Sequence, residues 1–412
     1  MSKRFIIILI TSVLALLFIS LIGYYFIIGN ATGADGTSKP FSFRSFLPFG
    51  GDSVPPEETP GNTDTGTDTA TSTLPITNND FTQKLRRLSS EPVAGFGVAD
   101  IKAGTLVRYI QKATGHIYEA QMFSPINIRI SNTTIPLVYD AVWNSTASST
   151  VARYLHDDNT TVDTYSLTLK NTSSTTENTI GGIAFPGSIS DVSIYGNSVF
   201  YLQLSADISQ GYVSNIDGSK KKLIWSSEIK ELNSQFVNDK TVALNTKPYR
   251  DVPGYLYLVD TGTGSVKKVL GDIPGLSSLV SPTVSSVLYL AQRNALRMYV
   301  LDTKSKTSLE IAPQTFPEKC VWSKKDASIV YCAVPKVSIN GDSLTLWYMG
   351  LTSFDDDIWK YNLRDGTSVI LDGLEEAGEA IDVVKPMLSA NDQYLVFINK
   401  IDNSLWSLDL TK

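Results

Sequence analysis

Beyond about residue 80, short apolar runs alternate with polar turns in a pattern that repeats along the chain. Each repeat contains a run with an aromatic residue three positions before an acidic, amide or polar residue, as in YLVDTG, YVLDTK and WSLDLT. These runs are rich in β-branched and aromatic residues and are flanked by Gly, Asn, Asp and Ser, which predicts β-strands joined by tight turns. The aromatics recur at intervals of 47, 47, 45, 42, 60 and 47 residues: Tyr118, Tyr165, Tyr212, Tyr257, Tyr299, Trp359 and Trp406.

A second apolar run precedes each of these strands, for example VLYL around Tyr289 and LVFI around Phe397. A period in the forties with several strands per unit is typical of a β-propeller, in which each blade is a sheet of four antiparallel strands. One such sheet is apolar on both faces, so neighbouring blades must pack against each other around an axis. The sequence therefore predicts an all-β fold, a seven-bladed β-propeller over residues 81–412, with the repeated aromatics in its packing.

The last repeat supplies only three strands. KLRRLSS, residues 84–90, comes before the first full repeat and is predicted to join the last blade as its missing outer strand. Closing the ring with strands from both ends of the propeller sequence would protect sheet edges that otherwise invite aggregation.

Residues 5–28 form an uncharged apolar run, FIIILITSVLALLFISLIGYYFII. As a helix this run would reach about 36 Å, enough to span a bilayer. It is longer than the apolar run of a cleaved signal peptide and ends in aromatics that suit the membrane interface. We therefore interpret residues 1–29 as a retained transmembrane signal-anchor, with a cleaved signal peptide as the alternative. Lys3 and Arg4 favour a cytoplasmic N-terminus, which places the rest outside the cytoplasm.

Residues 30–80 are rich in Thr, Pro, Gly and Asp and show no persistent strand or helix pattern. Such a composition cannot bury enough apolar surface to fold. We interpret the segment as a disordered stalk, with a plain linker as the alternative. The predicted localisation is the cell membrane, in a single-pass protein that carries its propeller on the extracytoplasmic side.

Two repeats carry a resemblance to a known family. WSKKDASIVYCAV from Trp322 and PMLSANDQYLVF from Pro386 resemble the strand, polar turn, strand motif of TolB-like and WD40-like propeller repeats, W-S-x-D-G-x-x-I-x-Y. Asp326 is followed by Ala327 and Asp392 by Gln393, where the family pattern has glycine. The resemblance implies a binding or scaffolding propeller, and it specifies a fold without specifying chemistry.

The composition of the chain argues against several classes of function. Only two histidines, His116 and His156, and two cysteines are present, too few for a His-rich or four-Cys metal site. The net charge is −6 and no Lys/Arg-rich run occurs, which argues against nucleic-acid binding. Phosphate-loop and nucleophile-elbow motifs are absent from the sequence, and both histidines are interpreted as structural or solvated. We therefore expect a protein that is not an enzyme and has no cofactor.

The 60-residue interval marks an insertion into the sixth repeat, PKVSINGDSLTLWYMGLTSFDDD. Insertions in repeat folds map to exposed loops that often form the binding face, so four of its residues are predicted to contact a partner: Trp347, Tyr348, Met349 and Phe354. The alternative is an extra hairpin packed on the rim. The aspartates at residues 355–357 could ligate a hard cation such as calcium, or could simply be solvated.

Cys320 and Cys332 lie on the two strands of one predicted hairpin, whose turn is centred near Lys325 and Asp326. In that register they face each other or nearly so, at a separation that a disulfide can span, and an oxidising exterior would allow the bond. We predict a disulfide, with two buried free thiols as the alternative.

These features together predict a membrane-anchored extracytoplasmic propeller that acts as a binding scaffold in the cell envelope. Its partner would be a protein or an envelope glycan, and the sequence does not specify an oligomeric state. The alternative is an envelope enzyme, a glycan- or peptide-directed hydrolase or lyase, with its site on the propeller axis. An axial cluster of carboxylates with raised pKa values would favour this alternative. A third hypothesis is a purely structural spacer.

Overall fold

The computed structural model describes residues 83–156, 158, 160–170, 179–292 and 295–412. The predicted signal-anchor (1–29) and stalk (30–80) lie outside these residues and remain predictions. Within the described part of the chain, no helix is both long enough and apolar enough to cross a membrane.

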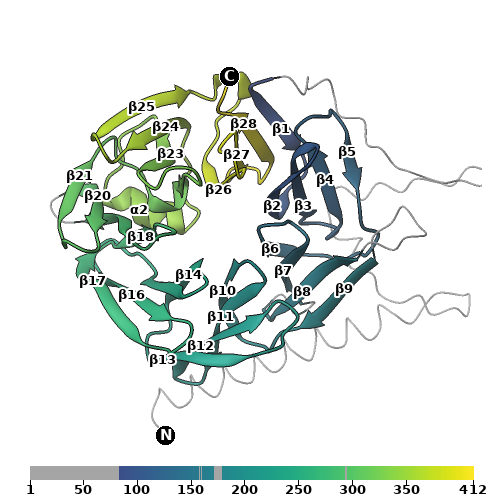
Figure 1. Cartoon of the computed structure of the whole chain (residues 1–412), viewed down its shortest axis with the longest axis horizontal. Helices are drawn as coiled ribbons and strands as arrows, with labels where there is room; N and C mark the ends of the chain where they lie inside the picture. The colour runs from purple at the N-terminus through teal and green to yellow at the C-terminus, as the bar shows by residue number, and fades with distance from the viewer. Residues whose placement is uncertain (1–82, 157, 159, 171–178, 293–294) are drawn as a thin grey trace, which may run out of the picture. The chain divides into compact units, whose positions relative to one another are not determined.

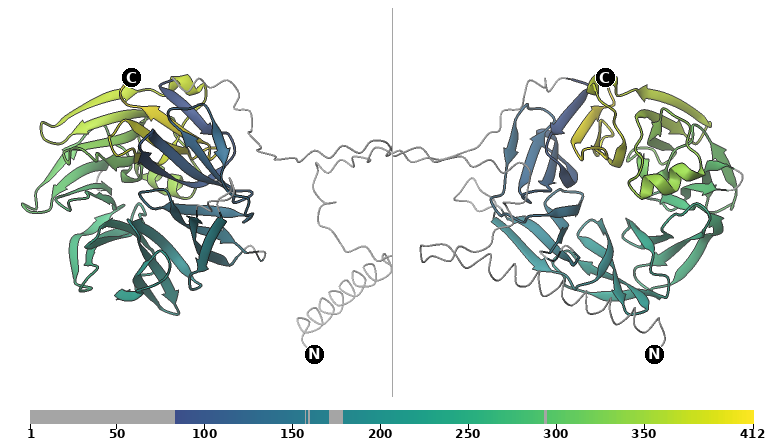
Figure 2. Two further views of the ribbon diagram at one scale, coloured as in Figure 1. Left: turned by 45° about the vertical axis from the view of Figure 1, so that its right-hand side comes forward. Right: turned by 180° about the vertical axis from the view of Figure 1, so that it is seen from behind.

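Seven antiparallel sheets of four strands surround a central axis (Figure 1), which confirms the predicted seven-bladed β-propeller. Within a blade the strands follow sequence order outward, with the first strand nearest the axis and the fourth at the rim (Figures 1 and 2). The first blade contains β2 (Val93–Ile101), β3 (Gly104–Gln111), β4 (Ile117–Gln121) and β5 (Asn127–Arg129); the second, β6 (Val138–Trp143), β7 (Ser149–Leu155), β8 (Val162–Lys170) and β9 (Thr179–Ala184); the third, β10 (Ile189–Tyr195), β11 (Ser198–Ser205), β12 (Ile208–Asn215) and β13 (Lys222–Ser227).

The remaining four blades continue in chain order around the ring. The fourth contains β14 (Leu232–Asn238), β15 (Thr241–Thr246), β16 (Pro253–Asp260) and β17 (Val266–Pro274); the fifth, β18 (Ser277–Val280), β19 (Ser286–Gln292), β20 (Leu296–Asp302) and β21 (Ser308–Ile311); the sixth, β22 (Cys320–Trp322), β23 (Ile329–Pro335), β24 (Asp356–Asn362) and β25 (Thr367–Asp372). The seventh contains β26 (Val383–Leu388), β27 (Tyr394–Asn399), β28 (Leu405–Asp409) and, as its outer strand, β1 (Leu85–Ser89).

The ring is closed where the two ends of the propeller sequence meet. β1 pairs antiparallel with β28, with Leu85 opposite Leu408 and Ser89 opposite Leu405. Leu85 and Leu408 are both buried against the seventh blade. β1 therefore supplies the fourth strand of the seventh blade and part of its apolar packing.

Blade packing explains the apolar second strands. In β19 every residue from Val287 to Ala291 is buried, because one face of the sheet meets the preceding blade and the other meets the following blade. Four stacked aromatic pairs join second and third strands, with ring centroids 5.3–5.5 Å apart: Tyr109 with Tyr118, Tyr154 with Tyr165, Tyr201 with Tyr212, and Tyr289 with Tyr299. These rings serve as packing, as interpreted from the sequence.

Several blades have the same type of turn between their first and second strands. In the seventh blade the Ser389 hydroxyl accepts the Tyr394 N–H, and the Asp392 N–H donates to the Ser389 carbonyl. Asp392 takes a left-handed backbone with φ 55°, and the corresponding residues Ala147 and Val284 have φ 49° and 60°. Glycine is suited to this conformation, and three non-glycine residues adopt it here. Ala327 and Gln393, which follow the aspartates where the family pattern has glycine, are not among the residues with positive φ.

The insertion in the sixth blade is a helix rather than the extra hairpin considered from the sequence. α2 (Gly341–Tyr348) connects β23 to β24, and Asn340 caps it by accepting the Ser343 N–H at 3.0 Å. Its Trp347 ring stacks on Phe316 at a centroid distance of 5.0 Å. The apolar residues of the insertion therefore bury a helix against the blade instead of extending a sheet.

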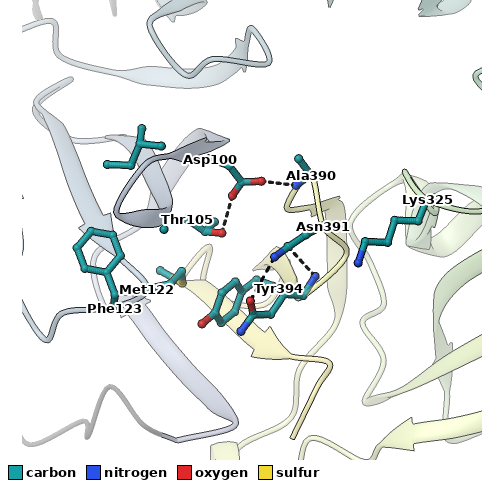
Figure 3. Close-up of a pocket in the computed structure, with 11 residues that line it drawn as sticks. Asp100, Thr105, Met122, Phe123, Lys325, Ala390, Asn391 and Tyr394 are labelled. Carbon is teal, nitrogen blue, oxygen red and sulfur yellow. Dashed lines mark hydrogen bonds between the residues drawn. The ribbon is translucent and has the colours of Figure 1, made fainter.

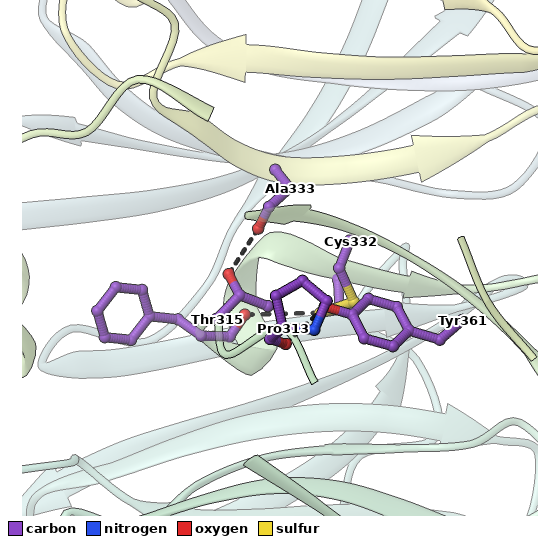
Figure 4. Close-up of a disulfide and its surroundings, with 7 residues drawn as sticks. Pro313, Thr315, Cys332, Ala333 and Tyr361 are labelled. Atoms are coloured by element: carbon purple, nitrogen blue, oxygen red, sulfur yellow. Dashed lines mark hydrogen bonds between the residues drawn. A yellow bond between two sulfur atoms is a disulfide. The ribbon is translucent and has the colours of Figure 1, made fainter. Parts of the chain in front are cut away.

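Cys320 and Cys332 lie directly opposite each other in the β22–β23 ladder (Figure 4). Their Cα atoms are 4.0 Å apart, their sulfur atoms are bonded, and both residues are buried. Within the described residues no cysteine is free. The disulfide links the two innermost strands of the sixth blade.

Candidate functional site

Two aspartates and a lysine lie at corresponding places on the innermost strands, where the strand pairing is irregular. Asp140 follows a bulge in β6, Asp191 follows one in β10, and Lys385 lies within one in β26. A bulge re-aims side chains and interrupts the regular alternation of a strand. Gly95 occupies the corresponding place in β2.

An ion pair crosses the inner edge of the first blade. The Lys385 ammonium of the seventh blade lies 2.5 Å from an Asp140 oxygen of the second blade. The first blade stands between them, and its Gly95 packs so closely on β6 that a Cβ there would lie 1.9 Å from the Ala141 carbonyl oxygen. The absence of a side chain at Gly95 therefore lets β2 pack closely on β6, and the Lys385–Asp140 pair links the seventh blade to the second.

The Asp140 carboxylate is held in its ionised form. Burial acts to raise its pKa, but Lys385 and Arg153 outweigh burial, and the pKa lies below its ordinary value. Arg153 lies 3.8 Å from Asp140 and donates to the Ile189 carbonyl at 2.9 Å. Its guanidinium also covers the Tyr139 ring, 5.3 Å from the centroid. The arginine is therefore fixed between the second and third blades.

Asp191 has the opposite character. Burial raises its pKa to about 6, and the negative charge of Asp140 adds to the effect, although hydrogen bonds from Ser234 act against it. One of these is donated by the Ser234 N–H at 2.5 Å and ties the third blade to the fourth. Near neutral pH this carboxyl group can therefore both release and accept a proton.

Lys112 completes a group that we call the axial cluster, formed by Lys112, Asp140, Arg153, Asp191 and Lys385. Burial and the neighbouring Lys385 lower the Lys112 pKa, and its ammonium donates to the Asn403 side chain at 2.8 Å. Lys112 lies in the turn after β3, and Lys385 near the start of β26. Both positions belong to one end of the blades, which we call the starting end because each innermost strand begins there.

The axial cluster has the elements of acid–base chemistry on an anionic substrate. Carboxylates whose environments push their pKa values apart are the usual arrangement for a proton-transferring group beside a permanently charged one. The side chains of Lys385 and Asp140 are 44% and 23% exposed, so solvent reaches the ion pair. The cations would attract a negatively charged ligand to the carboxyl group that titrates near pH 6.

Sequence analysis missed these residues because they are far apart along the chain and lie at bulges. A weak signal existed: β6 and β10 open with VYD and ISD, an apolar residue followed two positions later by aspartate, and β2 opens with VAG. The repeat could have shown that these positions correspond. It could not have shown which cations face them.

The residues predicted to contact a partner are for the most part buried, which corrects that interpretation. Trp347 and Phe354 are 4% and 8% exposed, and the Tyr348 hydroxyl donates to the buried Glu318 carboxylate. Only Met349, 63% exposed, lies at the surface. The physical reason is that α2 needs an apolar face to pack on the blade, and these aromatics provide it.

The three aspartates at residues 355–357, considered either as calcium ligands or as solvated carboxylates, do not converge. Asp356 is fully buried, 2.5 Å from the Lys319 ammonium, whereas Asp355 and Asp357 pair with Lys336 at 2.9 and 3.8 Å. Alternation along the strand sends neighbouring side chains to opposite faces. In the described part of the chain, no three His, Cys, Asp or Glu side chains are grouped so as to hold a metal ion.

No protein-family model matches the sequence, and no curated protein matches it. Among solved structures, the fold is similar to an oligogalacturonate lyase from Vibrio parahaemolyticus, with a TM-score of 0.51 and 10% identity over 79% of this chain and 93% of that one. An oligogalacturonate lyase in complex with manganese has a TM-score of 0.49, with 10% identity over 78% of this chain and 98% of that one. TolB from Acinetobacter baumannii has a TM-score of 0.42, with 11% identity over 76% and 78%.

This comparison corrects the expectation that the chain is not an enzyme. That expectation rested on the absence of phosphate-loop and nucleophile-elbow motifs and on two histidines interpreted as structural or solvated. The fold of this chain covers 93% of the Vibrio lyase, so a propeller of this kind can itself be an enzyme. The absence of those motifs therefore does not exclude an enzyme.

Proposed function

We propose that this chain is an acid–base enzyme that cleaves an acidic glycan at the axial cluster. The observation that carries the proposal is the pairing of two carboxylates with divergent pKa values beside three cations at the inner edge of the ring. The likeness of the fold to an oligogalacturonate lyase is consistent with this proposal. The main support for the proposal is the arrangement of charged residues in the axial cluster.

The reaction that suits these groups is elimination at a uronate sugar. The Asp191 carboxylate removes the proton from the carbon beside the sugar carboxylate, and the electron pair of that C–H bond forms a carbon–carbon double bond. The bond from the adjacent carbon to the glycosidic oxygen breaks, and this oxygen takes a proton from solvent. Asp191 then returns its proton to water, so no oxidant or reductant is required.

The cations have a separate task in this reaction. A carboxylate makes the neighbouring proton difficult to remove, because the carbanion that forms carries a second negative charge. Lys385 and Lys112 would pair with the sugar carboxylate and stabilise that developing charge. Arg153, fixed between two blades, would keep Asp140 ionised and the local geometry constant.

We further propose that the enzyme works in the cell envelope, held by a membrane anchor at residues 5–28 and a stalk at residues 30–80. A buried disulfide between Cys320 and Cys332 suits an oxidising compartment. Acidic polysaccharides are common outside the cytoplasmic membrane, so the proposed substrate and the proposed location agree.

The test is an assay of the full-length protein in detergent against polygalacturonate, alginate and hyaluronan, with neutral dextran for comparison. Elimination creates a conjugated double bond, so product is followed by its ultraviolet absorbance. We expect turnover of at least one acidic polymer and none of dextran. Asp191→Asn should lower the rate by about 10²- to 10⁴-fold, the usual contribution of a general base.

The matched control is Asp207→Asn, which removes a carboxylate that is 98% exposed and pairs with Lys230, a residue outside the cluster. It should retain the wild-type rate. Failure of every acidic polymer to react, or full activity of Asp191→Asn, would refute the proposed reaction.

A further inference from the structure

A cavity of about 450 Å³ lies between the first and seventh blades (Figure 3). It is bounded by the turn between β2 and β3, the turn between β26 and β27, and the turn after β4. In an antiparallel blade these turns lie at the end opposite the starting end, about one strand length or 17–20 Å from the axial cluster. The cavity is therefore a separate site, and its volume is in the range of small-molecule sites.

The walls of the cavity are braced by one hydrogen bond between the two blades and by others within each blade. The Asp100 carboxylate of the first blade accepts the Ala390 N–H of the seventh at 2.6 Å and the Thr105 hydroxyl at 2.5 Å (Figure 3). The Asn391 side chain accepts the Gln393 N–H at 3.1 Å and donates to the Gln393 side chain at 3.3 Å. The lining is thus fixed in position before any ligand arrives.

One wall carries an aromatic ring that is open to solvent. Phe123 is 40% exposed, and Ile101 beside it is 46% exposed. Gly104, with φ +138°, lies beneath the ring, and a Cβ there would be 2.7 Å from a Phe123 ring carbon. The glycine thus leaves room for the ring beside the turn, and the exposed part of the ring is available to an apolar surface such as the C–H side of a pyranose.

A cation stands on the other side of the cavity. Lys325 of the sixth blade is exposed and reaches toward Asn391 in Figure 3. Within the described residues its ammonium has no ion-pair or hydrogen-bond partner, whereas the neighbouring Lys324 ammonium donates to the Leu388 carbonyl at 2.6 Å. An unpaired cation at the mouth of a polar cavity favours an anionic group on the ligand.

From these contacts we propose that the cavity binds one acidic sugar unit of a glycan. The pyranose packs on Phe123, its hydroxyl groups bond to the amides of Asn391 and Gln393, and its carboxylate pairs with Lys325. This site is non-catalytic and goes beyond the proposed elimination, because it lies at the other end of the blades and needs no chemistry at the axial cluster.

The experiment is calorimetric titration of the full-length protein with galacturonic and glucuronic acid and their short oligomers, with galactose and glucose as neutral counterparts. We expect the acidic sugars to bind about tenfold more tightly than the neutral ones, the value of one charged contact. Lys325→Gln should abolish this preference and leave the weak neutral binding. Phe123→Ala should weaken both classes.

Lys304→Gln, in an exposed turn of the fifth blade, is the matched control and should change nothing. Thermal midpoints of all variants should stay at the wild-type value, because both altered side chains are at the surface. Equal binding of acidic and neutral sugars, absence of binding, or binding unaffected by Lys325→Gln and Phe123→Ala would each overturn the proposal. Asp191→Asn must leave this binding intact, so failure of catalysis and failure of this site are distinguishable.

Discussion

At the scale of single residues, environment gives identical side chains different chemistry. Asp140 and Asp191 occupy corresponding positions in neighbouring blades, yet cations lower the pKa of the first and burial raises that of the second. The same holds in the sixth blade, where burial raises the pKa of Asp356 to about 6 while its neighbour Asp355 lies at the surface beside Lys336. Residue type alone therefore does not identify a proton-transferring group in this chain.

The pKa of Asp191 gives the proposed reaction a definite pH dependence. A base acts only when deprotonated, so the rate with an acidic polymer should rise as pH increases through about 6 and then level off. Asp140→Asn should shift this midpoint downward, because it removes the negative charge that helps to raise the Asp191 pKa. Measurement of kcat/KM across pH 4–8 tests both statements. A midpoint unchanged by Asp140→Asn would contradict the assigned coupling.

Lys319→Met should be the most destabilising single change in the sixth blade. The Lys319 ammonium is fully buried and contacts the buried carboxylates of Asp356 and Asp382. Without it Asp356 would lose its cation, and Asp382 would keep only Lys400, 3.9 Å away. Breaking such a buried ion pair costs about 3–5 kcal/mol in the free energy of unfolding. Lys319 acts to lower the Asp356 pKa, so its removal would raise that pKa further and Asp356 would bind a proton more strongly in the folded state. The loss of stability should therefore be greater at pH 7 than at pH 5.

Urea unfolding at the two pH values measures this effect. Lys336→Met is the control, because its pairs with Asp355 and Asp357 are partly exposed and should be worth less than about 1 kcal/mol. Equal losses of stability at both pH values for Lys319→Met would show that Asp356 does not titrate as described.

At the scale of elements, the strands of the blades could be predicted from the sequence, whereas the helix α2 could not. Apolar runs with β-branched residues and flanking turns predicted the blade strands, because alternation and turn chemistry are local. In α2 the apolar residues were interpreted as partner contacts, although Asn340 and Ser343 have the spacing of a helix cap. A helix of eight residues is decided by packing as much as by its own sequence, and that packing involves Phe316, far along the chain.

Asn340→Ala should loosen α2 without unfolding the propeller. The Asn340 side chain accepts the Ser343 N–H, and the Ser343 hydroxyl bonds back to Asn340 in a capping box. Loss of such a cap costs about 1 kcal/mol. Hydrogen exchange of the amides in Gly341–Tyr348 should quicken, while exchange in β23 is unchanged. Asn340→Asp keeps the acceptor and should restore protection; quickened exchange in this control would count against the cap.

At the scale of the whole molecule, repetition made the architecture predictable and the axial cluster unpredictable. The period of the aromatics gave the number of blades, because each blade contributes one unit to the ring. The cluster depends on contacts between blades, such as Lys385 with Asp140, 245 positions apart. Such a contact also depends on the bulges and on the missing side chain at Gly95, which no local pattern specifies.

Leu88→Asp should open the ring. Leu88 is 4% exposed in β1 and packs with the core between the first and seventh blades, so a buried carboxylate there should detach the strand. The free edge of β28 would then be able to pair with another chain, and we expect a lower thermal midpoint and self-association in size-exclusion chromatography. Leu309→Asp, at a leucine 58% exposed on the outer strand β21, should remain monodisperse like the wild type.

The closure of the ring by β1 also sets how the molecule responds to mechanical load. Any tension applied through the chain before Leu85 acts first on β1, at the end where Leu85 faces Leu408. A force that pulls Leu85 directly away from Leu408 would separate the pairs of this ladder one after another. The other six blades are each built from four consecutive strands, so β1 is the strand that such a force would detach first.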